Sequence, residues 1–95
     1  MKYKIDFTSN FKKQYKKVKK QGKDLNKLYE IIEQLAKGKE LEPKYRNHNL
    51  INNKRFEDCR ECHIEPDWLL VYKIKDSELI LLLLATGSHS DLFSK

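Results

Sequence analysis

Four side chains of this chain are suited to moving protons near neutral pH: His48, His63, Asp67 and His89. Imidazole serves as a general acid or base because its ordinary pKa, about 6.5, lies close to neutrality. Arginine and lysine bind phosphate and stabilise the negative charge that develops on a reacting phosphorus. The cations near the four residues in the sequence are Lys44, Arg46 and Arg60. Together these groups indicate cleavage of RNA without a metal ion.

In that reaction a base removes the proton of a ribose 2′-OH, and the oxygen attacks the adjacent phosphorus. An acid protonates the departing 5′-oxygen, which leaves a 2′,3′-cyclic phosphate and a 5′-OH end. Tyr45, Trp68 and Phe93 are candidates for stacking unpaired bases, although packing in the core is an equally good expectation for Trp68. A single histidine is more commonly an ordinary residue than a catalytic one, so the prediction requires all four side chains to converge.

Strands are expected to position these groups. Alternating polarity before Pro66 and an apolar run after Trp68 predict strands at 56–64 and 68–75, joined by a turn at 65–67. A further strand is predicted at 3–7. Residues 79–86 are apolar on both faces, which is typical of a central strand. We expect an extended, functional loop at 39–55 and a polar tail at 86–93.

Two helices are predicted between the first strand and this loop. Thr8 or Ser9 can cap the first helix, which carries apolar residues at helical spacing up to residue 18, and Asp24 can cap the second, which ends near Gly38. The element order β-α-α-β-β-β predicts an α+β fold. In this fold an N-terminal strand and a helix hairpin pack on a twisted, mainly antiparallel β-sheet. Residues 1–95 are expected to form one domain.

The charge distribution is strongly basic, with a net charge of +6 and a pI of about 9.3. The first 23 residues contain nine lysines and a single acidic residue, Asp6. A basic surface of this kind favours a polyanionic partner, either nucleic acid or an acidic protein. No apolar run approaches the roughly 18 residues of a membrane span, and no signal peptide is visible. We therefore expect a cytoplasmic protein that does not bind membranes and keeps its two cysteines reduced.

The segment Cys59–His63 matches the C-x-x-C-H spacing of haem attachment. Cys59 and Cys62 would point to opposite faces of a strand, so they could not grip one ring edge together. The body of the chain also lacks a methionine for the axial position and a second Cys/His pair for zinc. No metal and no cofactor are predicted.

Three segments, 44–50, 60–72 and 86–93, resemble YafQ-type toxins of the RelE/ParE superfamily of bacterial toxin–antitoxin systems. The resemblance implies the RelE-like toxin fold and a ribosome-dependent mRNA endonuclease, or mRNA interferase, that inhibits translation and needs no metal. It also implies an acidic cognate antitoxin of the DinJ type. Operator DNA would be bound only through the toxin–antitoxin complex.

The resemblance also assigns residues. His48, His63, Asp67 and His89 match the family's catalytic positions, and Phe93 matches a terminal aromatic residue that is important for activity. His89 is expected to be the general acid, Asp67 or His63 the base, and His48 a supporting group. Lys44, Tyr45, Arg46, Arg60, Trp68 and Phe93 are expected to bind the substrate.

One position departs from the family pattern. An arginine usually precedes the Thr-Gly or Leu-Gly pair of the last segment, whereas Ala85 stands there in this chain. Losing such a charge-assisted contact to the scissile phosphate typically costs about 2–4 kcal/mol of transition-state stabilisation. The hypothesis is that the chain is attenuated, by a natural or an introduced change.

Two other functions remain open from the sequence. The first is a non-catalytic gyrase inhibitor of the ParE branch, which would lack the histidine and aspartate set. The second is a basic RNA- or ribosome-binding module, for which the lysine-rich first helix alone would suffice. Cleavage of a translated message that depends on His89 would distinguish the nuclease from both.

Overall fold

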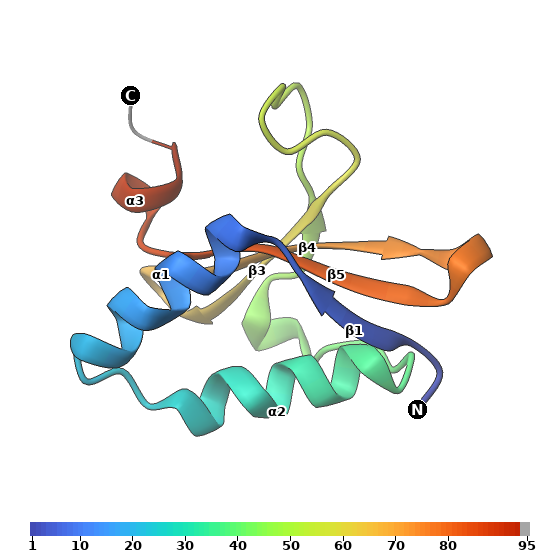
Figure 1. Cartoon of the computed structure of the whole chain (residues 1–95), viewed down its shortest axis with the longest axis horizontal. Coiled ribbons are helices and arrows are strands. Elements are labelled where there is room, and N and C mark those ends of the chain that lie inside the picture. Colours follow the sequence, from blue (N-terminus) through green and yellow to red (C-terminus); the bar gives the residue numbers. More distant parts are fainter. Residues whose placement is uncertain (94–95) are drawn as a thin grey trace.

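The computed structural model describes residues 1–93, and its centre is a five-stranded sheet in the order β1-β5-β4-β3-β2. The strands are β1 (Lys4–Phe7), β2 (His48–Asn49), β3 (Arg60–Glu65), β4 (Trp68–Lys75) and β5 (Ile80–Gly87). Only the β1–β5 pair is parallel. Figure 1 shows the long β4–β5 hairpin at the middle of the sheet. The predicted α+β fold with a mainly antiparallel sheet is confirmed.

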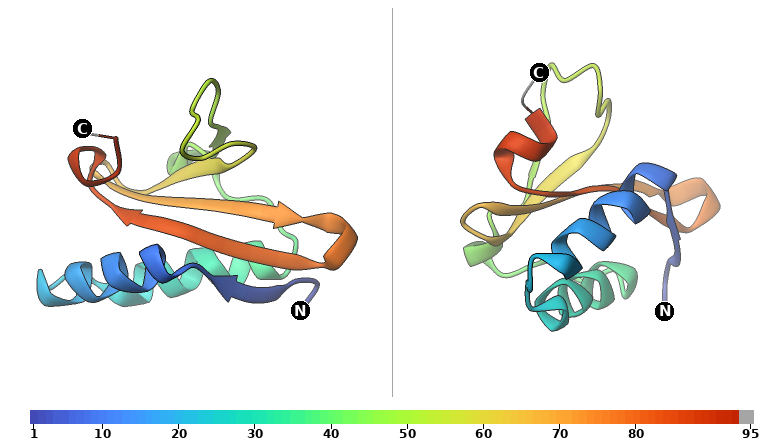
Figure 2. Two further views of the ribbon diagram at one scale, coloured as in Figure 1. Left: turned by 45° about the horizontal axis from the view of Figure 1, so that its top comes forward. Right: turned by 60° about the vertical axis from the view of Figure 1, so that its left-hand side comes forward.

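The helix hairpin consists of α1 (Ser9–Lys20) and α2 (Leu25–Ala36). The Thr8 side chain accepts a hydrogen bond from the Phe11 N–H at the start of α1, and Asp24 accepts one from the Asn26 N–H at the start of α2. Both helices lie on the same face of the sheet (Figure 2). The expected packing of the hairpin is therefore confirmed.

Two apolar clusters cover the two faces of the sheet. The first core lies between the sheet and the helix hairpin and contains Phe11, Leu28, Cys62, Ile64, Trp68 and Leu81 among its buried residues. The second core lies on the opposite face and contains Phe56, Cys59, Leu69, Val71, Ala85 and Leu92. A loop at 50–59 and the short helix α3 (His89–Phe93) cover this second face (Figure 2). Because both faces of β4 and β5 are covered, their sequences are apolar without interruption.

Strand β3 begins later than the sequence predicts, at Arg60 in place of residue 56. The Asn53 side-chain oxygen accepts hydrogen bonds from the N–H groups of Arg55 and Phe56, and Asp58 has a φ of 57°. These contacts form turns, which cannot continue a strand ladder.

Other segments also differ from the sequence prediction, because short turns and helices form within them. The predicted loop at 39–55 contains the 3₁₀ helix η1 (Pro43–Tyr45) and strand β2. A second 3₁₀ helix, η2 (Asp76–Glu78), joins β4 to β5, and Leu79 follows it with a φ of 54°. The predicted polar tail at 86–93 instead contains the end of β5 and helix α3. Within residues 1–93 no helix has the length and apolar character needed to cross a membrane.

Candidate active site

Strand pairing brings the first site residues together. Cys62 and Ile64 of β3 face the first core, so the alternate residues Glu61 and His63 face the other side of the sheet. His48 of β2 lies directly opposite Glu61 in the antiparallel β2–β3 pair. The local pattern of β3 therefore positions one histidine and one carboxylate, and β2 adds the second histidine.

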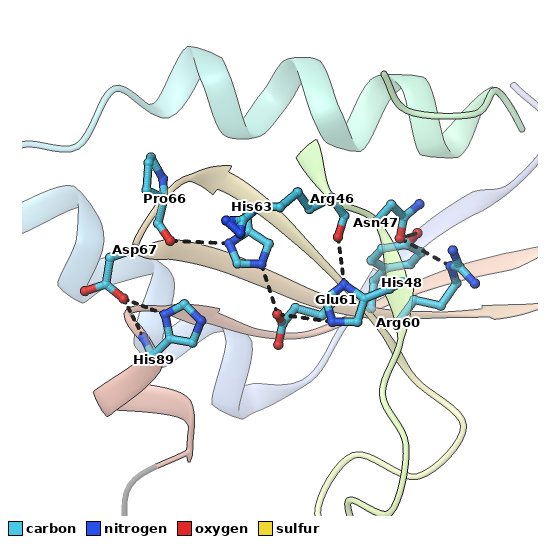
Figure 3. A network of polar contacts seen from close by, with 10 residues as sticks. Arg46, Asn47, His48, Arg60, Glu61, His63, Pro66, Asp67 and His89 are labelled. Atoms are coloured by element: carbon cyan, nitrogen blue, oxygen red, sulfur yellow. Dashed lines mark hydrogen bonds and ion pairs between the residues drawn. The ribbon is translucent and has the colours of Figure 1, made fainter. Parts of the chain in front are cut away.

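The four residues predicted to be catalytic converge (Figure 3). The ring centroids of His48 and His63 are 6.2 Å apart, and those of His63 and His89 are 5.6 Å apart. Asp67 Oδ1 accepts hydrogen bonds from the His89 backbone N–H at 3.0 Å and from its Nδ1 at 2.7 Å. Three imidazoles separated by 41 positions in the sequence thus line one surface that is wide enough for a single phosphodiester.

Glu61 is a further member of the site that the sequence did not single out. Its carboxylate oxygen Oε1 lies 3.3 Å from His63 Nε2 and 3.6 Å from His48 Nε2, and the residue is only 5% exposed. The sequence could have indicated this role, because Glu61 is two residues before His63 on a strand and their side chains therefore lie on the same face.

The hydrogen bonds of the His48 and His63 rings indicate which ring nitrogen carries the proton. His48 Nδ1 is 2.7 Å from the Arg46 carbonyl oxygen, and His63 Nδ1 is 3.3 Å from the Pro66 carbonyl oxygen. A carbonyl can only accept, so each Nδ1 carries a proton and each Nε2 faces Glu61. Nε2 is therefore the nitrogen of each ring that is available to accept a proton, and it lies beside the Glu61 carboxylate.

Asp67 has a different environment from Glu61. Hydrogen bonds from the His89 backbone N–H and then from the His89 ring hold the pKa of the Asp67 carboxyl below its ordinary value. The carboxylate thus stays ionised at neutral pH and orients the His89 ring. This arrangement commits Asp67 to His89, whereas His63 and His48 lie beside Glu61.

Helix α3 is short, and several contacts hold its start. The Ser88 N–H donates to Asp91 Oδ2 at 3.1 Å, and the Asp91 N–H donates to Ser88 Oγ at 3.1 Å. This reciprocal pair is a capping box with aspartate in place of glutamate. Lys17 of α1 lies 2.9 Å from Asp91 Oδ1 and, with Ser88, holds the pKa of that carboxyl below its ordinary value.

The loop at 50–59 holds the other end of α3. Arg55 Nη1 donates to the Leu92 carbonyl oxygen at 3.3 Å, and its guanidinium lies over the Phe56 ring at 5.4 Å. The Phe56 and Phe93 rings meet edge to face at a centroid distance of 6.0 Å. Phe93 is 37% exposed and lies 6.4 Å from the His89 ring, so it can contact a base beside the site.

The cations predicted to bind substrate lie along the site, in different settings. Lys44 and Arg46 are exposed, and Lys44 Nζ covers the Tyr45 ring at 5.1 Å. Arg60 is half-buried and donates to the side-chain oxygens of Asn47 at 3.3 Å and Asn49 at 2.6 Å. Arg60 therefore braces the segment that carries His48, whereas Arg46 and Lys44 are exposed and line a cleft beside His63.

The prediction that Trp68 stacks an unpaired base is wrong for this structure. Trp68 is 0% exposed, and its Nε1–H donates to Thr86 Oγ1 at 3.0 Å. Thr86 Oγ1 in turn donates to the Leu69 carbonyl oxygen at 2.8 Å. The Trp68 ring is buried in the first core, between the sheet and helices α1 and α2. Trp68 therefore supports the turn that carries Asp67.

Ala85 is also buried. It pairs with Val71 of β4, which pairs with Glu61 of β3, so Ala85, Val71 and Glu61 form one row across the sheet. An arginine at this position would begin in the second core, at 0% exposure, and extend along the face that carries the site.

His48, Glu61 and His63 could also ligate a metal ion, since one donor atom from each lies within 4.8 Å of the others. Two imidazole nitrogens and one carboxylate oxygen suit zinc or copper.

Comparison with known proteins identifies this architecture. The model of the family described as bacterial toxin of type II toxin–antitoxin system, YafQ, matches residues 3–94. The mRNA interferase toxin YafQ of Escherichia coli BL21-DE3 is 34% identical over 90 residues, which is 94% of each chain. The crystal structure of a metal-bound toxin from Helicobacter pylori has a TM-score of 0.89 and 44% identity, covering 96% of this chain and 99% of that one. The Escherichia coli DinJ–YafQ complex gives a TM-score of 0.85 and 34% identity, covering 96% and 98%. This chain belongs to the YafQ family of bacterial toxins of type II toxin–antitoxin systems.

Proposed function

We propose that this toxin is a ribosome-dependent endoribonuclease that cuts mRNA and so inhibits translation. The observation that carries the proposal is the pairing of two proton-transfer groups: His63 beside the buried Glu61, and His89 held by Asp67, with the two rings 5.6 Å apart. A base and an acid at this separation can act on opposite sides of one phosphorus.

In the proposed reaction, His63 with Glu61 removes the proton of the 2′-OH. The 2′-oxygen attacks phosphorus, and the imidazolium of His89 donates its proton to the departing 5′-oxygen. The products carry a 2′,3′-cyclic phosphate and a 5′-OH. Asp67 orients the His89 ring, and His48 supports Glu61 and the phosphate. Of the two bases expected from the sequence, the proposal selects His63, because Asp67 is engaged with His89.

No step in this scheme uses a metal ion. Because His48, Glu61 and His63 can also ligate one, cleavage should be measured with a chelator and with added zinc. Full activity in chelator, and inhibition by zinc that competes for Nε2, are expected. Activity that is lost in chelator and restored by a metal would contradict the metal-independent scheme.

The partners of this toxin are inferred from the positive charge of α1 and from the similar proteins. The last turn of α1 carries Lys17, Lys19 and Lys20, and such a surface would hold ribosomal RNA with an affinity that falls steeply with salt. The relative in the DinJ–YafQ structure is bound to its antitoxin, and we infer an acidic DinJ-like antitoxin for this chain. Operator DNA would be contacted only through that complex, and the site of action would be the cytoplasm, where ribosomes translate.

Primer extension on a translated message tests the proposal. The purified toxin is compared with His89→Ala and Glu61→Gln, each with and without ribosomes. Discrete cuts that require ribosomes and disappear in both variants are expected. Inhibition of DNA supercoiling without cuts, or ribosome binding without cuts, would contradict the nuclease and support the gyrase inhibitor or the binding module.

A further inference from the structure

A cleft opens beside His63 at the edge of the sheet. Strand β2 pairs only with Arg60 and Glu61, so no other strand of the described chain covers the outer edge of β3 beyond Glu61. The cleft lies between this edge, α2 and η1, and has a volume of about 320 Å³. That volume is at the small end of the range for ligand sites and leaves room for one nucleotide.

The walls of the cleft combine cations, carboxylates and rings. Lys27 and Glu30 of α2 line one side, Tyr45 and Arg46 line another, and His63 and Pro66 line the end nearest the catalytic cluster. Figure 3 shows the Arg46 side chain extending toward His63. Arg46 and Glu30 form no ion pair within residues 1–93, whereas Lys27 is 2.9 Å from Glu65.

These groups match the parts of a ribonucleotide. A guanidinium binds phosphate oxygens. An ammonium donates to base carbonyls and ring nitrogens, and a carboxylate accepts from exocyclic amino groups, so Lys27 and Glu30 can discriminate between bases. Tyr45 and Pro66 supply apolar surface for the base or the sugar. A surface for non-specific docking needs only cations, so the carboxylates point to recognition of a base edge.

The position of the cleft indicates which nucleotide it holds. In-line displacement requires the general base to lie near the attacking 2′-oxygen and the general acid to lie near the departing 5′-oxygen. The cleft is lined by His63, whereas Asp67, the partner of His89, lines a separate cleft on the other side of the turn. The nucleotide beside His63 is therefore the one whose 2′-OH attacks, immediately upstream of the cut.

We propose that the cleft between α2, η1 and β3 is a nucleotide subsite that binds the residue immediately upstream of the scissile bond and selects its base through Lys27 and Glu30. The assignment of "upstream" rests on the proposed endoribonuclease function. The chemical class of ligand is a ribonucleoside 3′-phosphate, which is also the form of the upstream product after its cyclic phosphate opens.

Binding is tested directly by NMR titration of the whole toxin with the four ribonucleoside 3′-monophosphates. Saturable shifts at Lys27, Glu30 and Arg46 are expected, with at least a fivefold preference for one base. Glu30→Gln, which keeps the side-chain volume, should reduce that preference at least fivefold. Glu33→Gln is the matched control, because Glu33 is on the same helix outside this cleft and pairs with Lys37. Equal binding of all four nucleotides, or shifts confined to α1, would overturn the proposal.

Cleavage mapping on translated messages gives the second measurement. Glu30→Gln and Lys27→Met should change base preference at the position immediately upstream of each cut and leave the downstream position unchanged. Cuts by the wild type with no change of upstream preference in either variant would refute the subsite alone. Base-selective binding in the cleft by a protein that never cuts RNA would refute the nuclease and leave the nucleotide site.

Discussion

The substitution Glu61→Gln separates catalysis from stability at the same residue. Glu61 is 5% exposed, and its two imidazole contacts, at 3.3 and 3.6 Å, are longer than the roughly 2.7–2.9 Å of a strong charge-assisted hydrogen bond. Burying a carboxylate costs several kcal/mol, and contacts of this length offset only part of that cost. A glutamine has the same shape, carries no charge and can donate its amide N–H to an imidazole Nε2.

We therefore expect Glu61→Gln to be as stable as the wild type or more stable, by about 1 kcal/mol at pH 8. Cleavage should fall about 10²–10⁴-fold, the usual contribution of a general base.

The assays are urea unfolding at pH 8 and single-turnover cleavage of mRNA on ribosomes. Glu57→Gln is the control, because Glu57 is exposed and lies outside the cluster. A Glu61→Gln protein that loses more than about 1 kcal/mol of stability and cuts at the wild-type rate per folded molecule would refute the reasoning.

Four further predictions concern the surroundings of the site. Trp68→Phe should lower the free energy of unfolding by about 2–3 kcal/mol, from a lost hydrogen bond and a cavity, with unchanged cleavage per folded molecule; a large loss of kcat at full stability would contradict its place in the core. Arg55→Ala should lower kcat several-fold and shift the NMR signals of α3 in the free toxin, whereas Lys54→Ala should change neither. Asp91→Asn should destabilise α3 at neutral pH, because a carboxyl with a lowered pKa contributes while it is ionised. The difference from wild type should begin to decrease as the pH falls below the ordinary carboxyl pKa of about 4 and should disappear only below the lowered pKa of the folded state; a difference that stays constant down to about pH 2 would exclude the ionic contribution. Ala85→Arg should raise the cleavage rate about 10²–10³-fold if a missing phosphate contact attenuates this chain, at a cost in stability from the buried position; an unchanged rate in a folded variant would refute the attenuation.

Much of the fold was readable from local patterns. Helices α1 and α2 were predicted with their caps, because apolar spacing and capping residues are properties of a few neighbouring positions. The turn at Pro66 and Asp67 and the buried β5 were readable for the same reason. The start of β3 was not, because Phe56 lies in a turn at Asn53 and packs against Leu69, Val71 and Ala85, which are distant in the sequence.

The sequence by itself determined which chemical groups are present: three imidazoles, the Asp67 carboxylate and a basic first helix, in the order of the YafQ family. The tertiary structure decided their roles. Strand pairing placed His48 opposite Glu61 and made that carboxylate part of the site, the hydrogen bonds of Asp67 assigned it to His89, and the first core enclosed Trp68. Residue types limit what a side chain can do, but burial and hydrogen bonds to distant segments select among those possibilities, because both depend on neighbours that lie far away in the chain.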